Sequence, residues 1–240
     1  MNKINDLQKI IESSDSIVFF GGAGVSTESG IPDFRSKSGI FKSLEKYGDT
    51  PERLVSHSYY LEHTDEFFNY YKDCLIFPDA KPNPAHYTLA RLEKEGKLKA
   101  IITQNVDSLH QKAGSKNVLE LHGSIYRNYC ETCKKSYDLD FILKSKGIPH
   151  CSCGGIIKPD VVLYEETLDT NILNKSIEYI RQADTLIVGG TSLVVYPAAG
   201  LINYFNGKNL VLINKSKTEY DSLASLVINE AIGETLAKIK

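Results

Sequence analysis

Short apolar runs alternate with longer amphipathic stretches along this 240-residue chain, and this alternation limits the possible folds more than any other feature. The apolar runs predict buried strands at residues 17–20, 100–103, 118–121, 185–188 and 210–213, with a weaker one at 225–228. The amphipathic stretches predict helices at 1–13, 83–95, 107–113, 171–182, 196–205 and 231–240. Strands that alternate with helices predict an α/β fold, with a parallel sheet and helices on both of its faces.

Polar motifs follow five of these runs directly, at Gly21, Gln104, His122, Gly189 and Asn214. The carboxyl ends of parallel strands meet at one edge of a sheet, and ligands of α/β proteins bind beyond that edge. We therefore expect these motifs to lie together and to form a dinucleotide site.

The first motif, at residues 21–35, combines glycines, small hydroxyl side chains and a proline. Gly22 and Gly24 allow another molecule to approach the backbone, and Ser26 suits the start of a helix whose free N–H groups attract anions. Strand, turn and helix start thus predict a phosphate cradle, although the Gly-x-Gly-x-x-Gly spacing is not met and a plain tight turn is the alternative. Residues 30–35, with the sequence GIPDFR, predict a loop that covers a ligand.

Residues 22–35, GAGVSTESGIPDFR, closely resemble the NAD-binding signature of the sirtuins, the NAD-dependent protein deacylases, with one conservative change at Val25. Further motifs follow in the order found in that family: TQNVD at 103–107, HG at 122–123, PDVVLYEE at 159–166 and GTSLVV at 190–195. The resemblance covers essentially the whole chain and is closest to the bacterial type.

The resemblance implies a set of NAD-binding residues. From spacing alone, Asn105 and Asp107 are as well suited to capping a helix as to binding a ligand. The family pattern favours the ligand, and it gives Asn105 a catalytic role in positioning water and the ribose. The implied NAD contacts are Gly22, Ala23, Gly24, Ile31, Asp33, Phe34, Arg35, Gln104, Asn105, Val106, Asp107, Gly190, Thr191, Ser192 and Asn214.

His122 is the general base that the resemblance implies. Histidine exchanges protons near neutral pH, but a lone histidine at a strand end is more often structural. In the reaction that the family implies, the acyl oxygen attacks C1′ of the nicotinamide ribose and nicotinamide leaves. His122 then takes a proton from a ribose hydroxyl, while Phe34 shields the reacting ribose.

Two closely spaced thiol pairs, Cys130 with Cys133 and Cys151 with Cys153, predict one structural zinc ion. Four thiolates leave no open position on the metal, so it should have no catalytic role. Free or disulfide-bonded thiols are the alternative, and His150 could replace one cysteine. Cys74 is distant in sequence and is expected to be a small buried side chain.

The resemblance assigns residues 159–166 and 193–195 to the groove that binds the acyl-lysine peptide. The implied contacts are Val161, Leu163, Tyr164, Glu165, Leu193 and Val194. Glu165 stands where the family has glycine, and it could favour basic flanking residues together with Glu166; both could also be solvated loop charges. The Tyr-x-x-Arg pair of succinyl-selective sirtuins is absent from 36–53, which predicts neutral acyl groups because a buried carboxylate without a cation is costly.

The chain divides into a Rossmann-like NAD-binding domain at 1–35, 78–125 and 160–240 and a smaller domain. The smaller domain combines a helical insertion at 36–77, which we expect to pack its own aromatic core, with the zinc module at 126–159. A net charge of −2 favours neither nucleic acid nor membrane, and the amphipathic N-terminus does not predict a signal peptide. We expect a cytoplasmic monomer.

Together these features predict an NAD-dependent protein lysine deacetylase that acts on acetyl-lysine proteins and releases nicotinamide and O-acetyl-ADP-ribose. A mono-ADP-ribosyltransferase that uses the same NAD site is one alternative. A non-catalytic, zinc-stapled peptide-binding module is another.

Overall fold

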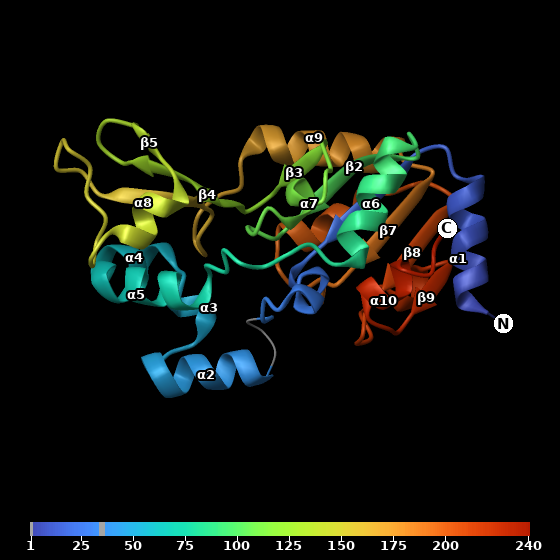
Figure 1. The fold of residues 1–240 in the computed structure, drawn as a ribbon. Coiled ribbons are helices and arrows are strands. Elements are labelled where there is room, and N and C mark those ends of the chain that lie inside the picture. The colour runs from blue at the N-terminus through green and yellow to red at the C-terminus, as the bar shows by residue number, and fades with distance from the viewer. Residues whose placement is uncertain (1, 34–36) are drawn as a thin grey trace.

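The computed structural model describes residues 2–33 and 37–240. A six-stranded parallel sheet in the order β3-β2-β1-β7-β8-β9 occupies the right-hand part of Figure 1, where the two ends of the chain also lie. All six predicted strands are therefore confirmed. Their bounds are β1 (Ile17–Gly21), β2 (Leu98–Thr103), β3 (Val118–Glu120), β7 (Thr185–Gly189), β8 (Asn209–Ile213) and β9 (Leu226–Ile228).

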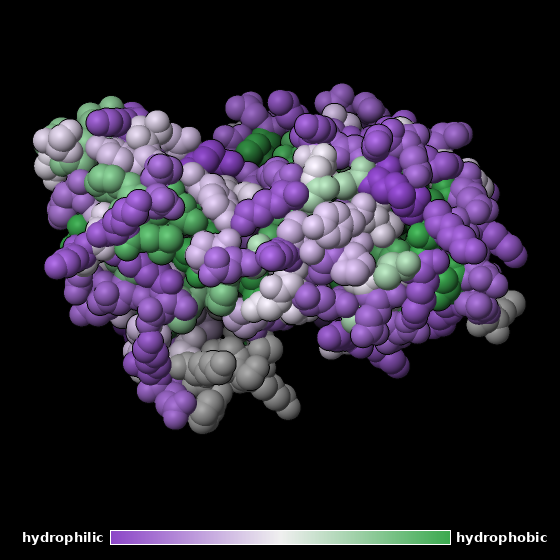
Figure 2. All heavy atoms as spheres, in the orientation of Figure 1, coloured by the Kyte–Doolittle hydropathy of each residue, from purple (hydrophilic) through white to green (hydrophobic). Residues whose placement is uncertain are grey.

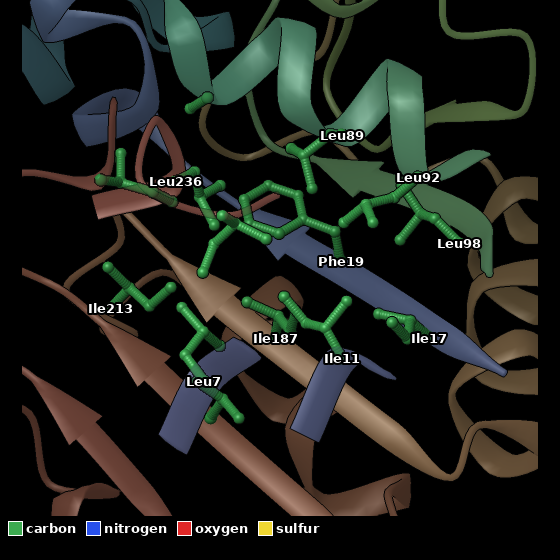
Figure 3. Packing of buried hydrophobic residues seen from close by; sticks show 14 of the residues in the cluster. Leu7, Ile11, Ile17, Phe19, Leu89, Leu92, Leu98, Ile187, Ile213 and Leu236 are labelled. Atoms are coloured by element: carbon green, nitrogen blue, oxygen red, sulfur yellow. The ribbon is translucent and has the colours of Figure 1, made fainter. Parts of the chain in front are cut away.

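Helices cover both faces of this sheet, as predicted. On one face, α1 (Lys3–Ser13), α6 (Pro84–Lys94) and α10 (Ile232–Leu236) pack around Phe19 of β1, and Figure 3 shows the Phe19 ring beside Leu89 and Leu92. On the other face, α9 (Thr170–Gln182) and the 3-10 helix η3 (Ala198–Tyr204) cover Val18 and Phe20. Side chains along a strand alternate between faces, so the unbroken apolar run of β1 supplies both cores.

Three predicted helices differ from the structure in length or type. The helix expected at 196–205 is the 3-10 helix η3, and the one expected at 231–240 is reduced to α10. The helix expected at 107–113 is the single turn α7 (Leu109–Lys112), and a further 3-10 turn, η4, spans Asp221–Leu223.

A second, antiparallel sheet has three strands in the order β5-β4-β6 and lies in the left-hand part of Figure 1. Five helices accompany it among the described residues. The bounds are β4 (Gly123–Cys130), β5 (Ser136–Tyr137), β6 (Ile157–Val161), α2 (Lys37–Tyr47), α3 (Pro51–Leu54), α4 (His57–Glu62), α5 (Thr64–Cys74) and α8 (Leu139–Lys144).

The helical insertion does not pack its own core, and this prediction is wrong. Phe67, Phe68 and Tyr71 of α5 share one buried cluster with Ile142 of α8 and Cys130 of β4. The insertion is too small to bury its large aromatic side chains alone, so they pack against the three-stranded sheet.

Local sequence signals set where the short helices begin. The side chains of Thr50 and Ser56 accept hydrogen bonds from the first turns of α3 and α4, and Asp138 does the same for α8. The cap at Ser56 fixes the position of His57 and Ser58, the first two residues of α4.

Hydrophilic residues cover most of the face in Figure 2, and hydrophobic residues gather over α4 and α8. None of the helices in the described part of the chain is long and apolar enough to cross a membrane. The domain boundaries stay a prediction; β4 and β6 extend past both ends of 126–159, to Gly123 and Val161.

Candidate active site

A cavity of about 260 Å³ lies where the two sheets meet, beyond the carboxyl ends of β1 and β2. Several predicted site residues come together in its wall: Ala23, Ile31, Asp33, Gln104, Asn105, Val106, Asp107, His122, Leu163, Tyr164 and Glu165. Residues of the helical insertion complete the wall, among them Pro51, Val55, Tyr70 and Leu75. The sequence predicted the edge of the sheet correctly but did not predict this contribution from the insertion.

The other predicted site residues that the structure describes do not line this cavity. Gly22, Gly24, Gly190 and Thr191 lie beside it, where the ends of β1 and β7 touch. The remaining ones are Ser192, Asn214, Val161, Leu193 and Val194, of which Val161 and Leu193 are buried and Val194 is exposed. Phe34 and Arg35 lie outside the described residues.

The glycines after β1 serve close packing between two turns. The N–H groups of Gly22 and Gly24 donate to the carbonyls of Gly189 and Gly190, at 3.3 and 2.8 Å. A Cβ atom on Gly24 would lie 2.8 Å from the Cα atom of Gly190, so a larger residue would force the turns apart. The helix start expected here consists of two short 3-10 turns, η1 (Ala23–Val25) and η2 (Thr27–Ser29).

Asn105, Asp107 and Ser26 form a hydrogen-bonded chain in the cavity wall. Asn105 Nδ2 donates to Ser26 Oγ over 3.1 Å, and Ser26 Oγ donates to Asp107 Oδ2 over 2.6 Å. Asp107 Oδ1 also accepts from the N–H of Leu109 at the start of α7, over 2.9 Å, so capping and ligand binding do not exclude each other. Burial raises the pKa of Asp107, while the bonds from Ser26 and Leu109 oppose that rise.

Ser26 is a site residue that the sequence reasoning missed. It lines the cavity and is 1% exposed. Its place within the glycine motif was the available signal, but the sequence does not show that its hydroxyl meets Asn105 and Asp107 from another loop.

His122 is oriented by backbone groups on both of its sides. Its Nδ1 lies 2.9 Å from the carbonyl oxygen of Gln104, which accepts a hydrogen bond from Nδ1–H and leaves Nε2 as the basic nitrogen of the neutral ring. Its own carbonyl accepts from the N–H of Val162 at 3.0 Å. The next residue, Gly123, has φ +75°, and a Cβ atom there would lie 1.8 Å from the carbonyl oxygen of Asp160, so no other residue fits.

The segment that contains Leu163, Tyr164 and Glu165 is fastened to the helical insertion. Tyr164 N–H donates to the carbonyl of Val55, and His57 N–H donates to the carbonyl of Tyr164. Glu165 and Glu166 are bonded to side chains and backbone at the start of α4, so they are not simply solvated loop charges.

The four cysteines are positioned to bind one zinc ion. Their Sγ atoms all lie within 4.8 Å of one another, with 3.4 Å between Cys130 and Cys153 and 3.5 Å between Cys133 and Cys151. A zinc ion with tetrahedral thiolate ligands requires sulfur atoms roughly 3.8 Å apart, whereas a disulfide requires about 2 Å. The site therefore fits the metal and excludes the disulfide alternative.

Two groups favour the thiolate form of Cys151. The backbone N–H of Cys153 and the hydroxyl of Tyr137 lower the pKa of the Cys151 thiol to about 5. His150, the alternative ligand, is not part of the cluster of four cysteines; its Nδ1 lies 3.3 Å from the carbonyl of Gly154. Cys74 is half-buried at the end of α5, not fully buried as predicted.

The sequence model of the Sir2 family matches residues 22–197, from the glycine turn to the residues that follow β7. The chain belongs to the Sir2 family. It is 65% identical to a protein of Clostridium perfringens named NAD-dependent protein deacetylase, over 99% of this chain and 98% of that protein. It is 61% identical to a protein of the same name from Clostridium acetobutylicum, over 100% of this chain and 98% of that one.

Solved Sir2 structures have the same fold. One holds a deacetylated p53 peptide and 3′-O-acetyl ADP ribose; it shares 38% identity and a TM-score of 0.89, over 98% of this chain and 96% of that one. Another, of Sir2 with a p53 peptide and NAD+, shares 39% identity and a TM-score of 0.86, over 97% and 95% of the two chains.

Proposed function

We propose that this Sir2 protein is an NAD-dependent protein lysine deacetylase. The observation that carries the proposal is the meeting of His122, Asn105 and Asp107 with the peptide-groove residues Leu163 and Tyr164 in one cavity. Because the cavity joins the edge of the six-stranded sheet to the loop after β6, a dinucleotide and a peptide can meet there.

The polar groups of the cavity suit NAD. Ser26, Asn105 and Asp107 offer hydroxyl, amide and carboxylate groups that can bind a carboxamide or ribose hydroxyls, and Ala23, Ile31 and Val106 supply apolar contact. When bound, NAD supplies the ADP-ribosyl group that accepts the acetyl group. Gln104, whose Nε2 donates to Thr191 Oγ1 over 3.1 Å, links this region to the predicted phosphate and ribose residues 190–192.

His122 is the general base of this proposal. The carbonyl of Gln104 holds the proton on Nδ1, so Nε2 can take a proton from a ribose hydroxyl. Asn105 orients water and the ribose, and its tie to Ser26 fixes the direction of its amide.

The zinc ion has a structural role in this proposal. Cys130 and Cys151 belong to the buried cluster that α5 and the three-stranded sheet share, and none of the four cysteines lines the cavity. Four thiolate ligands would hold the carboxyl end of β4 and the loop at 151–153 together. They would leave no coordination position on the metal for substrate.

The substrates of this proposal are proteins and peptides with a neutral acyl group on lysine. None of the described residues that line the cavity is Lys or Arg, so a negatively charged acyl group would find no Lys or Arg counterion among them. The absence of nucleic-acid partners, the monomeric state and the cytoplasmic location stay predictions from the sequence.

The variants His122→Ala and Asn105→Ala test these roles. The wild-type protein should remove acetyl groups from an acetyl-lysine peptide only when NAD is present, and each variant should lose at least about 100-fold in kcat. His63→Ala, which changes an exposed histidine that does not line the cavity, is the matched control. A His122→Ala variant that folds and turns over like the wild type would exclude His122 as the base.

A further inference from the structure

The substrate segment at 163–166 is held by the first turn of α4. Ser56 and Tyr164 form a parallel β-bridge, which continues through the hydrogen bonds of Tyr164 with Val55 and His57. These contacts join a loop of the peptide groove to the helical insertion, more than a hundred residues earlier in the chain.

Glu166 lies at the centre of this junction. Its carboxylate accepts from the N–H of Leu163 at 2.8 Å, faces His57 Nδ1 at 2.8 Å and accepts from Lys158 Nζ at 3.2 Å. The N–H of Glu166 in turn donates to the carbonyl of Leu163 at 3.1 Å, which closes the loop on itself. The side chain is 22% exposed, so it is shielded from much of the competing water.

Glu165 makes the second attachment. Its backbone has φ +78°, a conformation that costs energy for any residue other than glycine. Its carboxylate accepts from both the N–H and the Oγ–H of Ser58, each at 2.9 Å. These two charge-assisted bonds offset the backbone strain and hold the left-handed turn in place.

We propose that His57 and Ser58 are positioning residues for the acyl-lysine peptide: they hold Glu166 and Glu165 and thereby fix the 163–166 segment before the peptide binds. This inference rests on the proposed function, because that segment must bind the peptide for its order to affect catalysis. A groove ordered in advance lowers the entropy cost of peptide binding and leaves the bond-breaking steps unchanged. The carboxylates are engaged within the protein, so they do not select basic residues in the peptide.

The direct test is a double variant, His57→Ala with Ser58→Ala, in the full-length zinc-bound protein. The KM for an acetyl-lysine peptide should rise about fivefold to tenfold, as expected for the loss of charge-assisted hydrogen bonds, while kcat and the KM for NAD change less than about twofold. Ser58→Thr keeps the hydroxyl and should retain the wild-type KM. His63→Ala, at the other end of α4, is the control for the histidine change.

Hydrogen exchange supplies a readout that does not depend on activity. In the peptide-free wild type, the N–H groups of Leu163, Tyr164 and Glu166 should be protected, and in the double variant they should exchange faster while those of β1 do not change. Equal protection of the 163–166 segment in both proteins would overturn the inference.

Two substitutions of Glu165 separate the anchor from the backbone strain. Glu165→Ala removes the two hydrogen bonds to Ser58 and keeps the strained φ. Glu165→Gly removes the same bonds and also relieves the strain. Alanine should therefore raise the peptide KM more than glycine does, and Glu165→Gln, which keeps the side-chain length, should raise it least.

The failures of the two proposals are distinguishable. An active wild type whose peptide KM is unchanged by the double variant, or a variant that loses kcat with KM unchanged, refutes the positioning role alone. A wild type that consumes no acetyl-lysine peptide with NAD refutes the proposed function, whatever the exchange experiment shows.

Discussion

Arg127 Nη1 lies 2.6 Å from Glu120 Oε2, and this ion pair spans the junction between the two sheets. Glu120 is 6% exposed, ends β3 and stands two residues before His122, while the Nε of Arg127 bonds Asp160 Oδ2 of β6 at 2.7 Å. Ser108 and Gln111 donate to the other oxygen of the Glu120 carboxylate. One guanidinium thus joins β6 to the end of β3, two residues before the proposed general base His122.

Replacing Arg127 should weaken both stability and catalysis. In Arg127→Met the buried Glu120 carboxylate loses its cation, which should cost about 2 kcal/mol of unfolding free energy, less than for a fully buried pair because Arg127 is partly exposed. Denaturant titration measures that loss, and kcat should fall because the end of β3 positions His122.

The double variant Glu120→Gln with Arg127→Met is the control for this pair. It removes the unpaired charge, so its stability should exceed that of Arg127→Met alone. A double variant less stable than the single one would show that the ion pair is not the source of the effect.

Acidification should destabilise the protein through two buried histidines. His86 and His110 lie with ring centroids 4.7 Å apart behind the glycine turn; burial lowers the pKa of His86 to about 4 and that of His110 well below its usual range. Unfolding restores the ordinary value, so the unfolded chain binds more protons below about pH 6.5. Stability should therefore fall as the pH decreases from 6.5, by about 3 kcal/mol at pH 4 for His86 alone.

His86→Asn isolates this effect, because its amide oxygen can replace Nδ1 as the acceptor for Asn83 N–H. The variant should lose less stability than the wild type between pH 7 and pH 5 in denaturant titrations. Equal losses in the two proteins would assign the acid sensitivity to other groups.

Removal of zinc should unfold the smaller sheet before the larger one. The purified protein should contain one zinc ion per chain by elemental analysis, and a strong chelator should lower the melting temperature and abolish peptide turnover. Hydrogen exchange should then increase in β4 and β6 and remain slow in β1. A Cys130→Ser variant with full zinc content would contradict the assignment of the ligands.

Acyl selectivity follows from the charges of the cavity. Acetyl-lysine and propionyl-lysine peptides should both be substrates, whereas succinyl-lysine should be turned over at least about tenfold less efficiently because no cation among the described lining residues faces it. Competition between the three peptides, followed by mass spectrometry, measures the ratios. Faster removal of succinyl groups would show that a cation reaches the site.

The sheet and its ligand-binding edge were predictable from the sequence because the information is local. The run at Ile17 to Phe20 is apolar at every position, as a strand buried on both faces requires, and the motifs follow the strands directly. The cysteine pairs predicted the zinc module for the same reason, since the spacing of the cysteines in the sequence identifies the four ligands.

The errors concern contacts between distant segments. The side chains of Phe67 and Tyr71 predict burial but do not reveal that their partner is the three-stranded sheet. The hydroxyl of Ser26 and the first turn of α4 acquire their roles only through Asn105, Asp107 and Glu166, which lie 79 to 109 positions away in the sequence. The glycine turn predicted a helix start with free N–H groups, whereas the N–H groups of Gly22 and Gly24 donate to the carbonyls of Gly189 and Gly190 at the end of β7.

The products formed from one acetyl-lysine peptide and NAD test the central claim most directly. Quantitative mass spectrometry should find one nicotinamide and one O-acetyl-ADP-ribose for each acetyl group removed, and no loss of acetyl groups without NAD. Consumption of NAD with the peptide left acetylated, or deacetylation that releases free acetate without NAD, would contradict the account.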